Sequence, residues 1–107
     1  MPLQATTESK RPARREIAVS VVVPVYNEAA SLRELHQRLR AVLEGLGESF
    51  EVIYVDDGST DTSRELIEEL AEADRSVTLV ELAHNAGQHG AVLAGFQVSR
   101  GKVVVTV

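Results

Sequence analysis

The stretch FEVIYVDDGSTDTSRELIEEL, residues 50–70, decides the fold, because its periodicity changes across a polar turn. Residues 50–55 form an apolar run rich in β-branched and aromatic side chains, which is typical of a strand buried on both faces. Residues 56–59, Asp-Asp-Gly-Ser, favour a turn. Apolar side chains then recur at helical spacing, at Leu66, Ile67, Leu70 and Ala73.

The same alternation continues on both sides of this stretch. Residues 18–24 (AVSVVVP) predict a buried strand that has Pro24 at its end, and residues 77–82 and 103–107 predict two more strands. A helix before residue 50 is indicated by the spacing of Leu32, Leu35, Leu39, Val42 and Leu46. A helix at residues 88–99 has one side of small or apolar residues, at Ala91, Ala94, Gly95 and Val98.

The ends of the first two helices carry recognisable signals. Two pairs, Ser31 with Glu34 and Thr62 with Glu65, have capping-box spacing. The glycines at 45 and 47 supply the stop of the first helix. The order β-α-β-α-β-α-β predicts an α/β fold with a Rossmann-like parallel sheet and right-handed crossovers.

The composition limits the class of protein and its partners. The chain has 107 residues, 44% hydrophobic, no cysteine and a formal net charge of -5, which fits one globular domain and excludes a disulfide scaffold. Residues 1–16 carry four basic and two acidic side chains and are expected to form a disordered tail. Residues 17–107 carry seven basic and fourteen acidic ones, which argues against nucleic acid as a partner. The chain lacks a membrane-spanning run and a signal peptide, and is expected to be cytoplasmic.

Polar clusters follow the first three strands and are expected to meet at one rim of the sheet. They are residues 26–28 (Tyr-Asn-Glu), 56–59 (Asp-Asp-Gly-Ser) and 84–89 (His-Asn-Ala-Gly-Gln-His). The ring of Tyr26 offers a face on which a base can stack. A carboxylate such as Asp57 can accept a hydrogen bond from a base, and Gly87 lets the backbone approach a phosphate or sugar closely.

Each cluster also has a purely structural interpretation. Asp57 could belong to a simple turn, and Ser59 or Thr60 could cap a helix. Tyr26 could cover the core with its hydroxyl in water. Asn85 and Gly87 could occupy positions of positive φ.

Other residue types exclude further kinds of site. His36 is expected on the surface or in the core, and His84 and His89 lack the companions of a zinc site. The chain contains neither a GxGxxG nor a GxxxxGKS/T loop, which removes the usual NAD and ATP sites.

Three segments together resemble the opening of a family 2 glycosyltransferase, a family with the GT-A nucleotide-sugar fold. They are VSVVVPVYNEAASL, FEVIYVDDGSTDTS and LAHNAGQHGAVLAGF. Residues 87–96 resemble the polyprenyl-phosphate branch, which includes dolichyl-phosphate mannose synthases and undecaprenyl-phosphate sugar transferases. The resemblance covers residues 17–107 and implies that they are the nucleotide-sugar-binding half of a GT-A domain.

The resemblance assigns donor-recognition roles but no reacting group within this chain. It places Tyr26 against the base, Asp57 at the base edge with Asp56 as its neighbour, and Asn85 and Gly87 near the ribose and diphosphate. The rest of the first motif, which borders the nucleotide, is Pro24, Asn27 and Glu28.

The family pattern also implies parts that the sequence does not contain. An Asp-x-Asp motif that binds Mg²⁺ or Mn²⁺ is expected directly after Val107, so the chain is expected to be truncated there and inactive alone. For the full-length protein the resemblance implies a nucleoside-diphosphate sugar donor, a polyprenyl-phosphate acceptor and a place at the cytoplasmic face of the membrane. The fourth strand would be an apolar edge, which predicts self-association.

Three alternatives stay open at the level of sequence. The chain could be a non-catalytic nucleotide-binding module, or a fragment that binds nothing. It could also be a receiver-like signalling domain, because of its paired aspartates. That interpretation is weakened because Lys102 opens a strand where the pattern requires a lysine near a strand end.

Overall fold

The structure, a computed structural model, describes residues 17–107 as four strands alternating with three helices. The elements are β1 (Val19–Val25), α3 (Ala29–Leu46), β2 (Phe50–Asp56), α4 (Ser63–Ala73), β3 (Val77–Glu81), α5 (Gly87–Val98) and β4 (Val103–Thr106). The predicted order is confirmed, and the bounds predicted for the four strands and for α5 agree within one residue. The two earlier helices were predicted from side-chain spacing, without bounds. The expected disordered tail, residues 1–16, lies outside the described residues.

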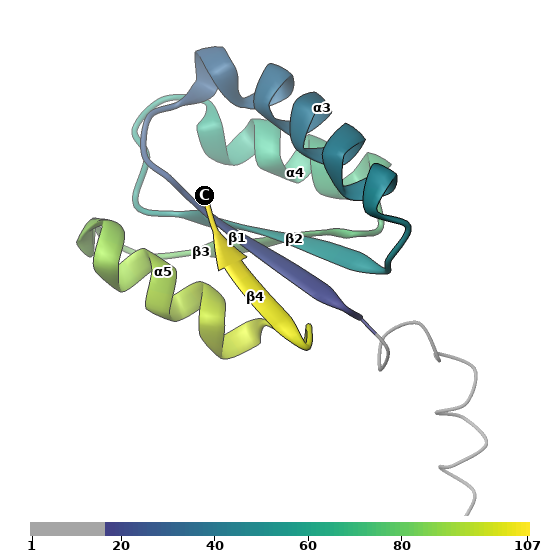
Figure 1. The fold of residues 1–107 in the computed structure, drawn as a ribbon. Coiled ribbons are helices and arrows are strands. Elements are labelled where there is room, and N and C mark those ends of the chain that lie inside the picture. Colours follow the sequence, from purple (N-terminus) through teal and green to yellow (C-terminus); the bar gives the residue numbers. More distant parts are fainter. Residues whose placement is uncertain (1–16) are drawn as a thin grey trace, which may run out of the picture.

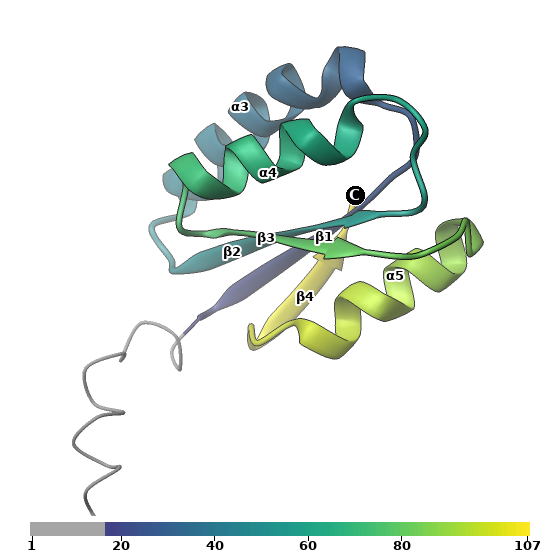
Figure 2. The same ribbon diagram turned by 180° about the vertical axis from the view of Figure 1, so that it is seen from behind.

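The four strands form one parallel sheet in the order β3-β2-β1-β4. Helices α3 and α4 cover one face and α5 covers the other (Figures 1 and 2). The chain therefore progresses outward from β1 to β3 and then crosses under the sheet to the far side of β1. This reversal makes the gap between β1 and β4 the topological switch point, beyond which ligands bind in open parallel sheets.

The central strand β2 is buried on both sides, as its apolar run predicts. Val52 and Tyr54 belong to the cluster packed against α3 and α4, whereas Ile53 and Val55 belong to the smaller cluster beside α5. All four are buried. The alternation follows from the two-residue period of a strand and leaves no solvent-facing side.

Helix α5 contacts the sheet through its smallest side chains. Ala91 is fully buried, and a Cβ atom at Gly95 would collide with Val22. Val98, which belongs to the same small or apolar side in the sequence, is the last residue of the helix and is exposed.

The helix signals give mixed outcomes. Gly47 ends α3 in the left-handed conformation, as predicted, with φ of 73°. The capping box predicted at Ser31 is wrong, because the N-cap of α3 is Glu28. Thr62 is the N-cap of α4, as predicted, but it makes no side-chain capping hydrogen bond. Helix α3 begins at Ala29, two residues before Ser31, so Ser31 already lies inside it.

Strand β4 forms an edge of the sheet, as expected from its position after the crossover. It pairs with β1 from Val19↔Val103 to Val22↔Thr106 and has no second neighbour among the described strands. Val103 and Val105 are exposed. Pro24 lies beyond the last of these pairs, where its missing N–H costs no ladder bond.

Candidate functional site

A hollow of about 370 Å³ opens at the carboxyl ends of β1 and β2, beside the first turn of α5. It is lined by Pro24, Val25, Tyr26, Glu28, Asp57, Asn85, Gly87, Gln88 and Val107. Six of the eight residues predicted for the site meet here, from three segments far apart in the sequence. Asn27 and Asp56 are not among the lining residues. Gln88 also lines the hollow; it belongs to the predicted polar cluster of residues 84–89 but had no predicted role.

The Tyr26 side chain is available to a ligand rather than packed in the core. The residue is 45% exposed and directly follows the end of β1. Its ring therefore lies at the wall of the hollow, where an aromatic face can stack on a base.

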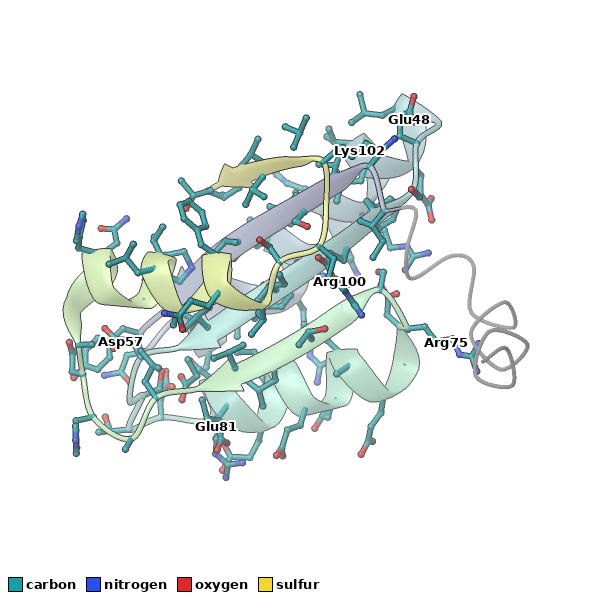
Figure 3. The ribbon with its side chains drawn as sticks, turned by 90° about the horizontal axis from the view of Figure 1, so that it is seen from below. Glu48, Asp57, Arg75, Glu81, Arg100 and Lys102 are labelled. Carbon is teal, nitrogen blue, oxygen red and sulfur yellow. The ribbon has the colours of Figure 1, made fainter. Side chains whose placement is uncertain are left out.

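The Asp57 carboxylate holds the loop between β3 and α5 in place. Asp57 is buried, and its two oxygens accept hydrogen bonds from the backbone N–H groups of Ala86 (2.6 Å) and Gly87 (3.0 Å). An ionised carboxylate has about four acceptor positions, so it can accept a further bond from a ligand while it keeps these two. Figure 3 shows Asp57 where this loop returns toward the end of β2.

Two glycines allow the β3–α5 loop to lie close to the end of β2. Gly58 has φ of 78°, and a Cβ atom there would lie 2.9 Å from the backbone nitrogen of Asn85. Gly87 has φ of 83° and begins α5, and its N–H also donates to the Asn85 side chain at 2.8 Å. Asn85 itself does not have positive φ. The loops after β2 and β3 are thus in direct contact.

Asp56 is the last residue of β2 and, unlike Asp57, does not line the hollow. Asp56 is 3% exposed, and its buried Oδ1 atom has no hydrogen-bond partner among the described residues. An ionised carboxylate without a partner is costly inside a protein.

The hollow carries negative charge and no positive side chain in its lining. Glu28 and Asp57 are the charged lining residues. Within residues 17–107 no three His, Cys, Asp or Glu side chains are grouped closely enough to hold a metal ion. The residues present therefore provide contacts for a base and a sugar, but not the positive charge that a diphosphate requires.

A second hollow, of about 530 Å³, lies at the opposite, amino end of the strands. Its charged lining residues are Glu51, Arg75 and Arg100, and it contains none of the eight residues predicted for the site. Figure 3 shows Arg75 and Arg100 at the end of the sheet away from Asp57. Although this hollow is larger, it lies at the amino ends of the strands, whereas the ligands of parallel α/β sheets bind beyond the carboxyl ends.

Comparison with curated proteins identifies close relatives of the chain. It is 54% identical over 90 residues to the undecaprenyl-phosphate 4-deoxy-4-formamido-L-arabinose transferase of Pseudomonas paraeruginosa, covering 83% of this chain and 26% of the relative. The protein of the same name from Salmonella dublin is 46% identical, with 83% and 28% covered. The chain thus spans about a quarter of the length of these relatives. No helix in the described part of the chain is long and apolar enough to cross a membrane.

Solved structures share the fold. Residues 1–349 of S. aureus TarS in complex with UDP superpose with a TM-score of 0.71 at 26% identity, covering 85% of this chain and 27% of that one. The mannosyltransferase PcManGT of Pyrobaculum calidifontis, in complex with GDP-Man and Mn²⁺, gives 0.67 at 27% identity, with 96% and 33% covered. The family model described as glycosyl transferase family 2 matches residues 20–107. The chain, with its motif residues gathered at the carboxyl rim of a parallel sheet, therefore belongs to glycosyl transferase family 2.

Proposed function

We propose that this chain supplies the donor-nucleotide half of a glycosyltransferase that moves a sugar from a nucleoside diphosphate to a polyprenyl phosphate. The observation that carries the proposal is the hollow itself, where Tyr26, Asp57, Asn85 and Gly87 converge from three loops. The names of the relatives, which are undecaprenyl-phosphate transferases, support the acceptor class. Membership of the family removes the receiver-like alternative.

Within this proposal the nucleotide lies across the rim. The base stacks on Tyr26, and Asp57 accepts a hydrogen bond from a base N–H while it keeps its two bonds to the loop. The ribose and diphosphate then lie toward Asn85 and Gly87. Pro24 and Glu28 complete the wall beside β1. Asn27 and Asp56 were predicted to bind the nucleotide as well, and their direct contact stays a prediction.

A divalent cation, Mg²⁺ or Mn²⁺, is part of the proposal for the whole enzyme. The described residues do not form a metal-binding set, and the hollow has no lysine or arginine in its lining. The charge of a bound diphosphate therefore has to be neutralised by groups other than these. The Mn²⁺ in the PcManGT complex supports a divalent ion in that role.

For the chemistry we propose an inverting transfer. The bond between the sugar's anomeric carbon and the donor phosphate breaks as the acceptor phosphate oxygen forms the new bond. Because the acceptor phosphate is already anionic, the reaction needs no general base. Positioning and charge stabilisation supply most of the rate. A polyprenyl acceptor is a membrane lipid, so we place the full-length protein at the cytoplasmic face of a membrane.

Calorimetric titration of the chain with UDP and with GDP, each with and without Mg²⁺, tests the proposal. Binding of one nucleotide supports the donor role and identifies the base. Because the described residues form no metal-binding set, this binding should change little with Mg²⁺, and transfer activity of the full-length protein is what separates an enzyme from a non-catalytic nucleotide-binding module. No binding of either nucleotide would contradict the donor role of residues 17–107.

A further inference from the structure

The backbone that opens α3 is bonded by side chains from the β2–α4 loop and from the first residue of α4. The backbone N–H groups of residues 27, 28 and 29 donate to Ser59 Oγ (3.0 Å), Ser63 Oγ (2.9 Å) and Asp61 Oδ2 (3.3 Å). These bonds replace the capping boxes predicted from the sequence, and they join segments more than thirty residues apart.

Asn27 makes the return connection. Its side-chain oxygen accepts hydrogen bonds from the backbone N–H groups of Thr60 (2.8 Å) and Asp61 (3.2 Å). We call Asn27, Ser59, Asp61 and Ser63 the loop clamp. The hydrogen bonds that Asp61 accepts from the hydroxyl and N–H of Ser63 and from the N–H of Ala29 lower the pKa of Asp61, which keeps this acceptor ionised.

The backbone of Asn27 is adapted to this role. Its φ is 53°, and among residues 17–107 it has the sole positive φ at a residue other than glycine. Asparagine tolerates this left-handed conformation better than most residues. The unusual backbone turns the side chain toward the β2–α4 loop, while the neighbours Tyr26 and Glu28 line the hollow and Asn27 does not.

We propose that Asn27 is a positioning residue, which fixes Tyr26 relative to Asp57 through the loop clamp, rather than a residue that contacts the nucleotide. Tyr26 directly precedes Asn27, and Asp57 directly precedes the loop that Asn27 holds. The clamp thus sets the separation of the two groups that would contact the base. This inference rests on the proposed nucleotide site for its consequence, but not for its geometry.

Three substitutions separate the contributions of Asn27. Asn27→Gly removes the acceptor oxygen and leaves the left-handed backbone unstrained. Asn27→Asp keeps an acceptor oxygen and removes the amide NH2 group. Ser63→Ala breaks the clamp from the other side at a fully buried residue. Ser31→Ala is the matched control, because within residues 17–107 its hydroxyl bonds only to Glu28, in the same helical turn.

The first readout needs no ligand. Amide hydrogen exchange at Thr60 and Asp61 should become at least about fivefold faster in Asn27→Gly, as expected for the loss of a hydrogen bond, and should stay near the wild-type rate in Asn27→Asp. With fluorine-labelled tyrosine, the signal of exposed Tyr26 should shift in Asn27→Gly and in Ser63→Ala, while that of buried Tyr54 should not. Ser31→Ala should change neither.

The second readout is the affinity for the nucleotide that the wild type binds. Asn27→Gly and Ser63→Ala should each weaken it by about three- to tenfold, and Ser31→Ala should not. If Asn27→Gly weakens binding but leaves the exchange rates and the Tyr26 signal unchanged, Asn27 contacts the nucleotide directly and the inference is wrong. If the wild type binds neither nucleotide, the proposed function fails, and the exchange and fluorine measurements still decide the clamp.

Discussion

Buried carboxylates at the two ends of the sheet differ in their hydrogen-bond and ion-pair partners. At the amino end, Glu51 accepts hydrogen bonds from the Ser20 hydroxyl (2.6 Å) and from the backbone (2.8 Å) and guanidinium (3.2 Å) of Arg100. At the carboxyl end, Asp57 is held only by backbone N–H groups, and Asp56 Oδ1 has no partner among the described residues. Glu51 thus has a guanidinium partner, whereas neither rim carboxylate has a positively charged partner among the described residues, which leaves negative charge at the rim for a ligand's donors.

A second compensated carboxylate, Asp74, lies just before β3. Its Oδ2 accepts from His36 Nε2 (3.1 Å) and contacts the Arg40 guanidinium, and its Oδ1 accepts from the Ser76 hydroxyl (2.7 Å). His36 Nδ1 lies 2.7 Å from the Tyr54 hydroxyl, whose pKa is raised by burial and by the nearby Asp74 charge. His36 is therefore a core residue, one of the two places expected for it.

The largest expected effect concerns the buried carboxylate at the amino end of the sheet. Glu51→Gln should lower the free energy of unfolding by about 3 kcal/mol, because it breaks a buried, fully bonded pair. Chemical denaturation measures this. The neighbouring exposed Glu48 is the control, and Glu48→Gln should change it by less than about 0.5 kcal/mol. If both variants changed the free energy of unfolding equally, the buried hydrogen bonds of Glu51 would not contribute to stability.

At the rim the largest effect should appear in binding. Tyr26→Ala should weaken nucleotide affinity by about 1–3 kcal/mol, the range for loss of one base stack, and change the unfolding free energy little because the side chain is exposed. Tyr26→Phe keeps the ring and should bind like the wild type. Titration calorimetry distinguishes them, and equal weakening in both would assign the contact to the hydroxyl instead.

Asp74 predicts an acid-dependent loss of stability. Burial raises its pKa, but the hydrogen bonds from Arg40, Ser76 and His36 outweigh burial and hold the pKa well below its usual range. Its contribution is therefore complete above the unfolded pKa of about 3.9 and is lost as the pH falls from there through the lower folded pKa. As the pH is lowered below 5, the free energy of unfolding obtained from denaturation curves should fall less steeply in Asp74→Asn than in the wild type. An equal pH dependence in the two proteins would contradict the prediction.

Substitution of Asp56, in contrast, is expected to stabilise the fold. Asp56→Asn should raise the free energy of unfolding by about 1 kcal/mol, because it removes a buried charge whose Oδ1 has no partner. If the rim is kept for function, the same variant should lose nucleotide or cation affinity. A destabilised Asp56→Asn would show that the carboxylate is compensated in a way that the hydrogen-bond geometry does not reveal.

The smallest effect concerns the edge strand β4. Its exposed valines and free backbone predict weak self-association, measurable as a rising mean mass in light scattering at high concentration. Val105→Lys places a charge on this edge and should reduce the rise, whereas Gln97→Lys on the exposed side of α5 should not. A wild-type chain that stays monomeric at all concentrations would refute the prediction.

The sequence by itself determined the element order and the rim, because strand and helix periodicities and turn residues are local signals. It also determined which residues gather at the rim, since the carboxyl ends of parallel strands share one edge. Tyr26, Asp57, Asn85 and Gly87 lie together for this reason.

Only the tertiary structure decided what each of these side chains is bonded to. The capping boxes fail and Asn27 acts across loops, because its partners are more than thirty residues away and no local pattern encodes them. Likewise, Glu51 and Asp56 are both acidic residues of the same strand, yet the first is compensated and the second is not. That difference depends on which segments pack against each end of β2. This is a property of the folded chain and cannot be read from the spacing of residues in the sequence.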